Sequence, residues 1–251
     1  MKTVLLNEKI KFSYIKNHLL FRHLDEEEVR DICSMANLIN LKANKPFQLN
    51  SNASGRVFFL GNGTAKIIQI TKTGKRSVKD ILVGGEVFGD VSLTGSNTDG
   101  YVVGLKANTY IFYFDSCEFR KMLCNNHLMS LNYMELISSK LRYLEAKHSL
   151  WTTKDARFRL LYFFRGWALC TGTRTEKSVI LENYFTLIDI AEFIGVTRQF
   201  IYTLLNELKE DGLINYSRKQ VEVNKLLLQK DIEKTKNLPI HKVSFDYFNS
   251  V

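Results

Sequence analysis

The chain of 251 residues lacks the features that mark membrane-spanning, secreted and low-complexity proteins. Its 2 prolines and 14 glycines exclude a collagen-like or low-complexity chain. No stretch approaches the roughly 18 consecutive apolar residues of a membrane span, and the apolar run at the N-terminus is too short for a signal peptide. Its 4 cysteines have no paired spacing, which fits a reducing compartment. We therefore expect a cytoplasmic protein with no membrane partner.

Aromatic side chains and positive charge are what the chain has in plenty. The 17 phenylalanines, 11 tyrosines and 2 tryptophans are typical of a folded core and not of a disordered chain. The net charge of +9, from 35 basic and 26 acidic residues, raises the hypothesis of a nucleic-acid partner. The excess is spread along the chain without a polybasic tail, so charge alone does not identify the partner.

Three sequence patterns follow one another along the chain. Residues 15–40 have helical spacing, with Asp25 as a candidate cap before three glutamates. Residues 41–115 contain short β-rich runs separated by glycine-rich turns, which is typical of an antiparallel sandwich or barrel. From Asp115 the pattern is helical again, and its clearest boundary falls near 149–154.

A narrow apolar stripe runs along the helix expected from residue 126 onward. Its members alternate in steps of three and four residues, which is the seven-residue repeat of a coiled coil. They are Met134, Ile137, Leu141, Leu144, His148 and Trp151. The stripe predicts a dimer interface, and packing of the helix on its own sheet is the alternative.

Residues 186–208 contain two short apolar-patterned helices joined by a tight turn. Thr186 and Thr197 each precede a helical pattern, as N-cap residues do. Ala191 is small where the two helices must approach each other closely, and Gly195 suits a left-handed turn. This pattern predicts a helix-turn-helix, whose second helix enters the major groove of DNA.

Polar side chains of the second helix define a candidate DNA-reading face. Burial of the apolar side of this helix turns outward Arg198, Gln199, Tyr202, Thr203 and Asn206. Arginine pairs best with guanine and glutamine with adenine. Thr197 and Thr203 suit phosphate contacts or a thymine methyl, and we include Thr186 with them. A hairpin expected over 213–224 carries Arg218 and Lys219 at its tip, where cations suit phosphates.

Two other classes of protein remain as alternatives. An ordinary helical hairpin, or a module that contacts protein instead of DNA, has the same spacing, although a protein-binding face would favour an apolar patch. An enzyme is disfavoured because the nucleotide-binding glycine patterns, the zinc-protease motif and the G-x-S-x-G elbow are all absent. Glu86 and Asp90 are a conceivable carboxylate pair, but nothing in the sequence places a substrate beside them.

Five segments carry a resemblance to a known family. They cover 20–28, 59–67, 85–93, AEFIGVTR at 191–198 and LKEDGLI at 208–214. In order and separation they resemble the Crp/Fnr superfamily of bacterial transcription regulators, from about Leu19 to Leu228. The last two segments are the most specific.

The resemblance implies an α+β fold in four parts. These are a double-stranded β-helix (jelly-roll) effector domain over 1–125, a dimerisation helix over 126–151, a winged helix-turn-helix over 152–228 and a C-terminal extension over 229–251. It also implies a homodimer that reads palindromic promoter DNA and acts with RNA polymerase. By resemblance, Arg198, Gln199 and Thr203 occupy base-reading positions. The family more often has Glu and Arg where Gln199 and Thr203 stand, so its half-site sequence is not carried over.

The sequence does not identify an effector. Cyclic-nucleotide members of the family carry an arginine for the phosphate where this chain has Asp99, whose charge repels a phosphate, and Asp90 replaces the usual glutamate. No cysteine cluster suits an iron–sulfur centre, and Cys117, Cys124 and His127 are not spaced as a compact metal site. We expect no metal, cofactor or cyclic nucleotide; haem, a peptide or thiol ligand, and regulation without an effector stay open.

Overall fold

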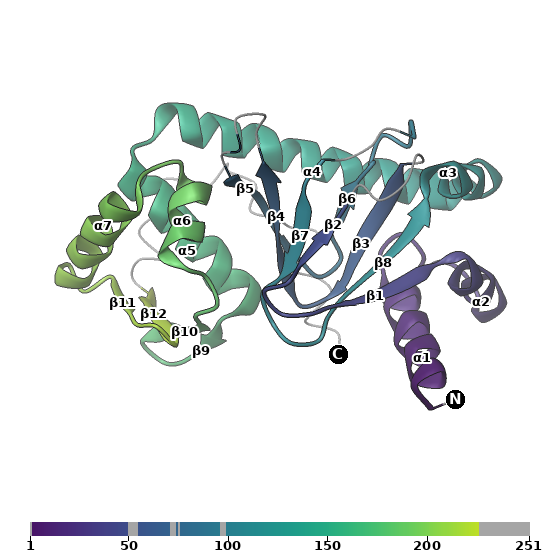
Figure 1. Ribbon diagram of the computed structural model, residues 1–251, viewed down its shortest axis with the longest axis horizontal. Helices are drawn as coiled ribbons and strands as arrows, with labels where there is room; N and C mark the ends of the chain where they lie inside the picture. The colour runs from purple at the N-terminus through teal and green to yellow at the C-terminus, as the bar shows by residue number, and fades with distance from the viewer. Residues whose placement is uncertain (1, 50–54, 71–73, 75, 96–98, 226–251) are drawn as a thin grey trace. The chain divides into compact units, whose positions relative to one another are not determined.

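A computed structural model describes residues 2–49, 55–70, 74, 76–95 and 99–225, with the side chains of 2–7 excepted (Figure 1). The apolar residues near the C-terminus, beyond Lys225, lie outside this described part. Contacts between residues divide the chain into two compact units. The first contains the residues up to Lys140, and the second begins at Leu141.

Within the described residues, the first unit combines three complete helices with eight strands. Its elements are α1 (Lys2–Asn17), α2 (Glu26–Met35), β1 (Asn37–Leu41), β2 (Pro46–Gln48), β3 (Arg56–Asn62), β4 (Thr64–Ile70), β5 (Arg76–Val83), β6 (Val87–Gly89), β7 (Tyr101–Gly104), β8 (Thr109–Asp115), α3 (Ser116–Asn125) and the first part of α4 (His127–Thr153). All strand pairs are antiparallel. They form two four-stranded sheets in the orders β1-β8-β3-β6 and β2-β7-β4-β5.

Both faces of β3 are buried over its central residues 57–60, which explains why these four residues are all apolar. Phe58 and Leu60 point into a core between the two sheets, together with Phe88 of β6. Val57 and Phe59 point the other way, into a core that the helices of this unit cover. The ring of Phe59 stacks on Phe112 of β8, with centroids 5.1 Å apart. The β-rich region is therefore a jelly-roll sandwich with helices on one outer face, and the α+β expectation is confirmed.

The single helix expected over 15–40 is wrong, because two helices and a strand share this region. α1 ends at Asn17, and the next turn is held by the ring of His18, whose Nδ1 accepts a hydrogen bond from the Leu20 N–H at 3.2 Å. Asp25 then starts α2 through a capping box with Glu28, as its sequence predicts. After α2 the backbone pairs with β8 as β1, and this tertiary pairing overrides the local pattern.

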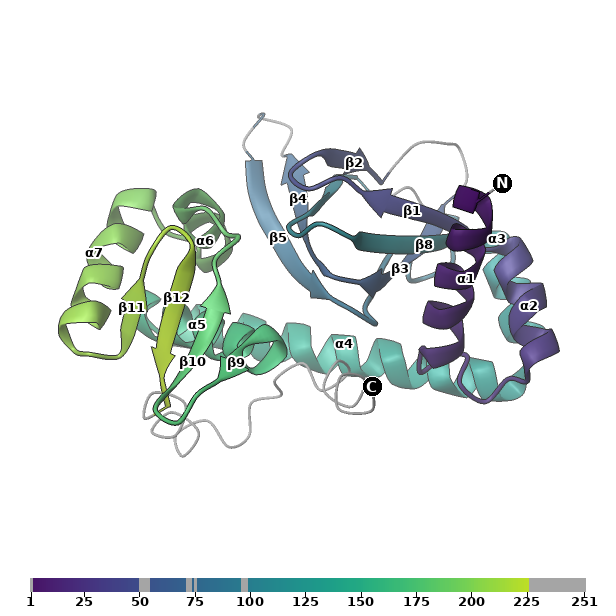
Figure 2. The same cartoon turned by 90° about the horizontal axis from the view of Figure 1, so that it is seen from below.

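The second unit contains the rest of α4 and a small helical and β domain (Figure 2). Its elements are α5 (Ala156–Thr171), β9 (Thr173–Arg174), β10 (Ser178–Glu182), α6 (Leu187–Ile194), α7 (Arg198–Glu210), β11 (Ile214–Tyr216) and β12 (Gln220–Asn224). The sheet has the order β11-β12-β10-β9. Its core is aromatic: Phe163 of α5 contacts both Phe185 and Phe193, at centroid distances of 5.4 and 5.6 Å.

The helix expected over 126–151 is observed as α4, His127–Thr153. Its first part packs on the jelly roll, where Met129, Tyr133 and Leu136 are buried in the helix-covered core. Lys140 ends this part with an ion pair to Asp80 of β5, at 3.6 Å. The division between the two units falls directly after Lys140, inside the helix.

Candidate nucleic-acid interface

Helix α6 begins with a complete capping box. The Thr186 hydroxyl accepts the Asp189 N–H at 3.1 Å, and the Asp189 carboxylate accepts the Thr186 N–H at 3.1 Å. Two backbone N–H groups that would otherwise lack a partner are thus hydrogen-bonded, and the Asp189 side chain is buried. The Thr186 hydroxyl keeps its own proton, and it lies exposed at the helix start.

The turn between α6 and α7 depends on Gly195. Its φ of 82° is in the left-handed region, where a side chain is strained, although a Cβ there would meet no other atom. The N–H groups of Gly195 and Val196 both donate to the Ala191 carbonyl, at 2.9 and 3.0 Å. Ala191 is buried, as its small side chain predicts. The helix-turn-helix is therefore present with the turn that its sequence indicates.

Helix α7 is capped at its start and buried along one side. The Thr197 hydroxyl accepts the Phe200 N–H at 3.2 Å. Ile201, Leu204, Leu205 and Leu208 form the buried side. The opposite side carries the predicted DNA-reading residues, all of them exposed: Arg198, Gln199, Tyr202, Thr203 and Asn206. One element thus presents a guanidinium, two amides, a phenol and a hydroxyl to solvent.

The threonines of this region differ in what they still offer to a partner. Thr186 and Thr197 accept backbone N–H groups, so their hydroxyl protons remain free to donate to a phosphate oxygen. Thr203 donates its proton to the Gln199 carbonyl at 3.3 Å. Thr203 therefore presents lone pairs and a methyl group on the outward side.

A hairpin of β11 and β12 forms the expected wing. Arg218 and Lys219 are exposed at its tip. Asn183, which is not part of the hairpin, holds this tip in place. It donates its side-chain amide to the Ser217 carbonyl at 2.7 Å and its N–H to the Lys219 carbonyl at 2.9 Å. Asn183 lies three residues before Thr186, so one short segment positions both the wing and the start of α6.

The far end of α7 is held by Arg157 of α5. Its guanidinium pairs with Asp211 and also lies 3.6 Å from the Glu207 carboxylate. These ion pairs tie the C-terminal end of α7, away from its polar first turn, to α5. No sequence pattern points to Arg157 or Asn183, because neither has its partner near in the chain.

Two exposed apolar side chains in this region do not follow from the sequence pattern. Phe200, in the first turn of α7, is 45% exposed, and Ile188 of α6 is 44% exposed. Phe200 precedes the buried Ile201, and consecutive helix residues differ in direction by about 100°. Phe200 and Ile201 therefore cannot face the core together, and the sequence does not show which of the two is buried.

The stripe on α4 is largely an exposed apolar surface. Met134, Leu141 and Leu144 are 57, 55 and 43% exposed, and Leu128 and Leu131 extend the row toward the start of the helix. His148 is also exposed. Two members of the predicted stripe differ from the others, as they pack within their own unit.

Those two residues are Ile137 and Trp151. Ile137 is half-buried against the helix-covered core of the first unit. Trp151 is half-buried in the second unit, where its Nε1 donates to the Phe193 carbonyl at 3.3 Å and its ring meets that of Phe193 edge-on. Lys147 lies over the Phe193 ring at 4.1 Å. The last turns of α4 are thus fastened to α6.

The Asp90 carboxylate, in the stretch that resembles an effector region, accepts hydrogen bonds from its own loop. Asp90 is buried and accepts hydrogen bonds from the Ser92 hydroxyl at 2.9 Å and the Gly95 N–H at 2.8 Å. Burial alone would raise the pKa of Asp90, but the hydrogen bonds from Ser116, Ser92, Gly95 and Thr94 outweigh it, so the pKa falls below its ordinary value.

The other two acids of this stretch lie in different surroundings. Glu86 is buried and accepts the Val83 N–H at 2.7 Å. Asp99 is exposed. The expectation that a cyclic phosphate is repelled at Asp99 stays a prediction.

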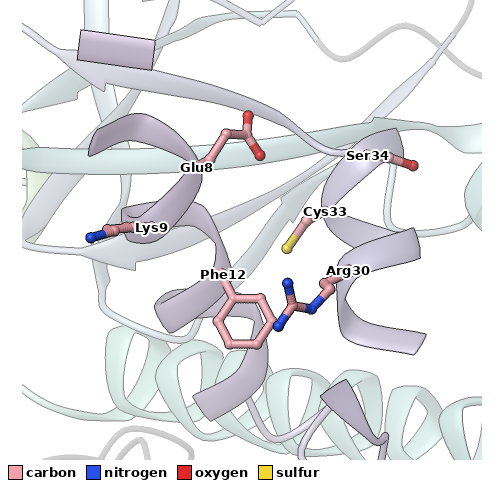
Figure 3. A pocket seen from close by; sticks show the side chains of 6 residues that line it. All are labelled: Glu8, Lys9, Phe12, Arg30, Cys33 and Ser34. Atoms are coloured by element: carbon pink, nitrogen blue, oxygen red, sulfur yellow. The ribbon is translucent and has the colours of Figure 1, made fainter. Parts of the chain in front are cut away.

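Buried His18 and Cys33 are uncharged. The His18 Nε2 donates to the Gly85 carbonyl at 3.0 Å, and burial lowers the pKa of His18 to about 4. Burial raises the pKa of Cys33 to about 11. Cys33 faces an open hollow of about 440 Å³ between α1 and α2, where Arg30 lies over the ring of Phe12 (Figure 3). A protonated thiol is a poor nucleophile and metal ligand.

The described residues contain neither a metal cluster nor a membrane-spanning helix. No group of three or more His, Cys, Asp or Glu side chains there is arranged to hold a metal ion. Within the same part of the chain, no helix has the length and apolar character needed to cross a bilayer.

The architecture combines a jelly-roll unit with a winged helix-turn-helix, and sequences similar to this chain belong to DNA-binding transcription regulators. The chain is 24% identical over 184 residues to the global nitrogen regulator of a Nostoc species, covering 72% of this chain and 82% of that protein. It is 21% identical over 218 residues to the cyclic AMP receptor protein of Thermus thermophilus, covering 87 and 98%. No protein-family model matches the chain.

Solved structures share the fold. A CooA mutant from Carboxydothermus hydrogenoformans matches with a TM-score of 0.65 and 23% identity, over 81% of this chain and 89% of that one. FixK2 from Bradyrhizobium japonicum matches with a TM-score of 0.65 and 15% identity, over 78 and 96%. In its sequence motifs and its fold, the chain is similar to the Crp/Fnr superfamily of DNA-binding transcription regulators. Its relatives are regulators and not enzymes.

Proposed function

We propose that the chain is a homodimeric regulator that reads a two-fold-symmetric promoter site through α7. The observation that carries this proposal is the exposed polar side of α7, which is capped at Thr197 and held at its far end by Arg157. Arg198 and Gln199 lie in its first turn, where side chains of a recognition helix reach base edges. The cations at the wing tip supply phosphate contacts beside the reading helix.

The dimer part of the proposal rests on the apolar row along α4. Monomeric soluble proteins rarely leave a row of large apolar side chains in water, and a symmetric pairing of two α4 helices covers it. Leu141 and Leu144 are the central members that lie exposed. Pairing also supplies two recognition helices, which a palindromic site needs about 34 Å apart.

The protein acts, in this proposal, on promoters together with RNA polymerase, under an effector that is not a cyclic nucleotide. The charge of Asp99 opposes a phosphate, and the Asp90 carboxylate is already committed to the loop of Ser92 and Gly95. Calorimetry with cAMP and cGMP tests this part. We expect no heat of binding, and micromolar affinity for either nucleotide would contradict it.

The DNA part is tested by selection from randomised duplexes, followed by binding to the selected duplex and to a scrambled one at several salt concentrations. We expect a palindromic consensus, tighter binding to the selected duplex, and affinity that falls steeply with salt. A module that contacts protein instead of DNA enriches no sequence. That outcome would overturn the proposed function.

A further inference from the structure

Phe200 is an aromatic ring on the surface of α7, the helix proposed to meet DNA. Its backbone N–H is fixed by the Thr197 cap, and its neighbour Ile201 is fully buried. These two constraints set the rotation of the first turn and leave 45% of Phe200 in solvent. Its position is therefore a consequence of the helix geometry and does not depend on a flexible loop.

The core of the second unit leaves Phe200 outside although it holds other aromatic rings. Phe163, Phe185 and Phe193 are buried there, and Phe163 contacts both of the others. A large apolar side chain in water costs free energy, which a partner that covers it recovers. An apolar group of the ligand is the natural match for such a residue on the proposed reading helix.

The major groove offers one such group. The C5 methyl of thymine is the apolar feature among the hydrogen-bonding base edges, and phenylalanine is one of the side chains that contact it. The amides of Gln199 and Asn206, on the same helix, are groups of the kind that pair with adenine. The exposed surface of α7 thus combines adenine-reading amides with a methyl-reading ring.

We infer that Phe200 reads a thymine in each half-site by contacting the C5 methyl group of that base. In addition to the base pair that Arg198 contacts, this helix then selects A·T pairs. This inference rests on the proposed function. It assigns specificity to a residue with no hydrogen-bonding atom in its side chain, beside the polar residues already described.

The test removes only the methyl group. Deoxyuridine pairs as thymine does but lacks the C5 methyl, so it is placed at each thymine of the selected duplex in turn. For the wild type we expect one position per half-site at which deoxyuridine weakens binding by about fourfold, the effect of one buried methyl-sized group. The other thymines are expected to change affinity little.

Variants of Phe200 test whether its ring causes the loss of affinity at the sensitive thymine. In F200A the loss on deoxyuridine substitution is expected to vanish, because no ring is left to contact the methyl. F200L keeps an apolar side chain and is expected to retain part of the loss. Ile188→Ala is the matched control, since Ile188 is equally exposed but lies on α6, and it is expected to discriminate as the wild type does. Circular dichroism checks that each variant is folded.

The possible outcomes distinguish this inference from the proposed function. If the wild type selects no sequence, the proposed function fails and this inference falls with it. If it selects a site but tolerates deoxyuridine everywhere, or if F200A still discriminates, the inference on Phe200 is overturned while the proposed function stands. An F200A protein that binds DNA as the wild type does but loses a protein partner would equally overturn it.

Discussion

The Asp90 loop of the jelly roll and the first turn of α7 use polar side chains in opposite ways. Asp90 is buried, and its carboxylate accepts hydrogen bonds from its own loop. Arg198 and Gln199 are exposed on a helix whose backbone is already capped by Thr197. The loop needs the Asp90 carboxylate for its own hydrogen bonds. The backbone of α7 does not need Arg198 or Gln199, so these two side chains are available to a partner.

Burial separates the structural polar groups of this chain from those available to a ligand. His18, Glu86 and Asp90 are as polar as the residues proposed to read DNA, yet each is buried and hydrogen-bonded to backbone groups. Their roles are to hold turns. Changes there are expected to alter stability, whereas changes on α7 are expected to alter binding to DNA.

The largest effect is expected from charging the α4 stripe. Leu141→Asp together with Leu144→Asp places two carboxylates in the proposed dimer contact, where they repel their symmetry mates. We expect monomers in light scattering and no measurable DNA binding. Ser149→Asp, at an exposed polar position of the same helix, is the control and is expected to stay dimeric. An unchanged mass for the double variant would rule out this interface.

The next largest effect is expected from the loss of Arg198, the arginine proposed to read a base. Arg198→Ala is expected to weaken binding to the selected duplex by about 1–3 kcal/mol and to relax preference at one base pair per half-site. Binding to a scrambled duplex, measured by anisotropy, is expected to change little. Equal losses on both duplexes would make Arg198 a phosphate contact and would misplace the reading surface.

A smaller and uniform effect is expected from the wing. Arg218→Ala with Lys219→Ala removes cations that pair with phosphates, so all duplexes are expected to lose affinity alike. The slope of log affinity against log salt is expected to flatten by about one unit for each phosphate that no longer has a cation beside it. A loss confined to the selected duplex would show that the wing reads bases.

The smallest effect on DNA is expected from the buried acid. Asp90→Asn removes the charge that accepts the Ser92 and Gly95 hydrogen bonds, and we expect a stability loss of about 1–3 kcal/mol with DNA affinity unchanged. Its folded pKa lies below the ordinary 3.8. The stability from Asp90 is therefore complete above pH 3.8 and is lost as pH falls through the folded value.

Urea unfolding at several pH values measures this contribution. The variant is expected to lose the part of the acid dependence that the wild type owes to Asp90. An Asp90→Asn protein of full stability but weaker DNA binding would break the distinction between the two regions.

Local signals in the sequence are sufficient to predict much of the helix-turn-helix. Thr186, Gly195 and Thr197 act within a few residues of themselves, so their capping and turn roles follow from spacing alone. The contacts of Arg157 with α7 and of Asn183 with the wing join distant parts of the chain, and spacing does not show them. They are visible only once the chain is folded.

The same limit explains where prediction fails outside that segment. Asp25 is recognisable as a cap because its capping box with Glu28 is local. The strand β1 cannot be recognised from its local sequence, because it forms by pairing with β8, more than sixty residues away. The apolar repeat on α4 likewise shows which residues share one side of the helix but not what they pack against. Trp151 therefore falls within the predicted stripe, although its ring packs on Phe193.

The central claim is that two copies of α7 read the two halves of one DNA site. Its most direct test is a titration of the protein against the selected palindrome and against a duplex with one half-site scrambled, with the mass of each complex measured. We predict two chains per palindrome and a loss of specific affinity when either half is scrambled. One chain per duplex, or equal affinity for the intact and half-scrambled sites, would contradict this claim.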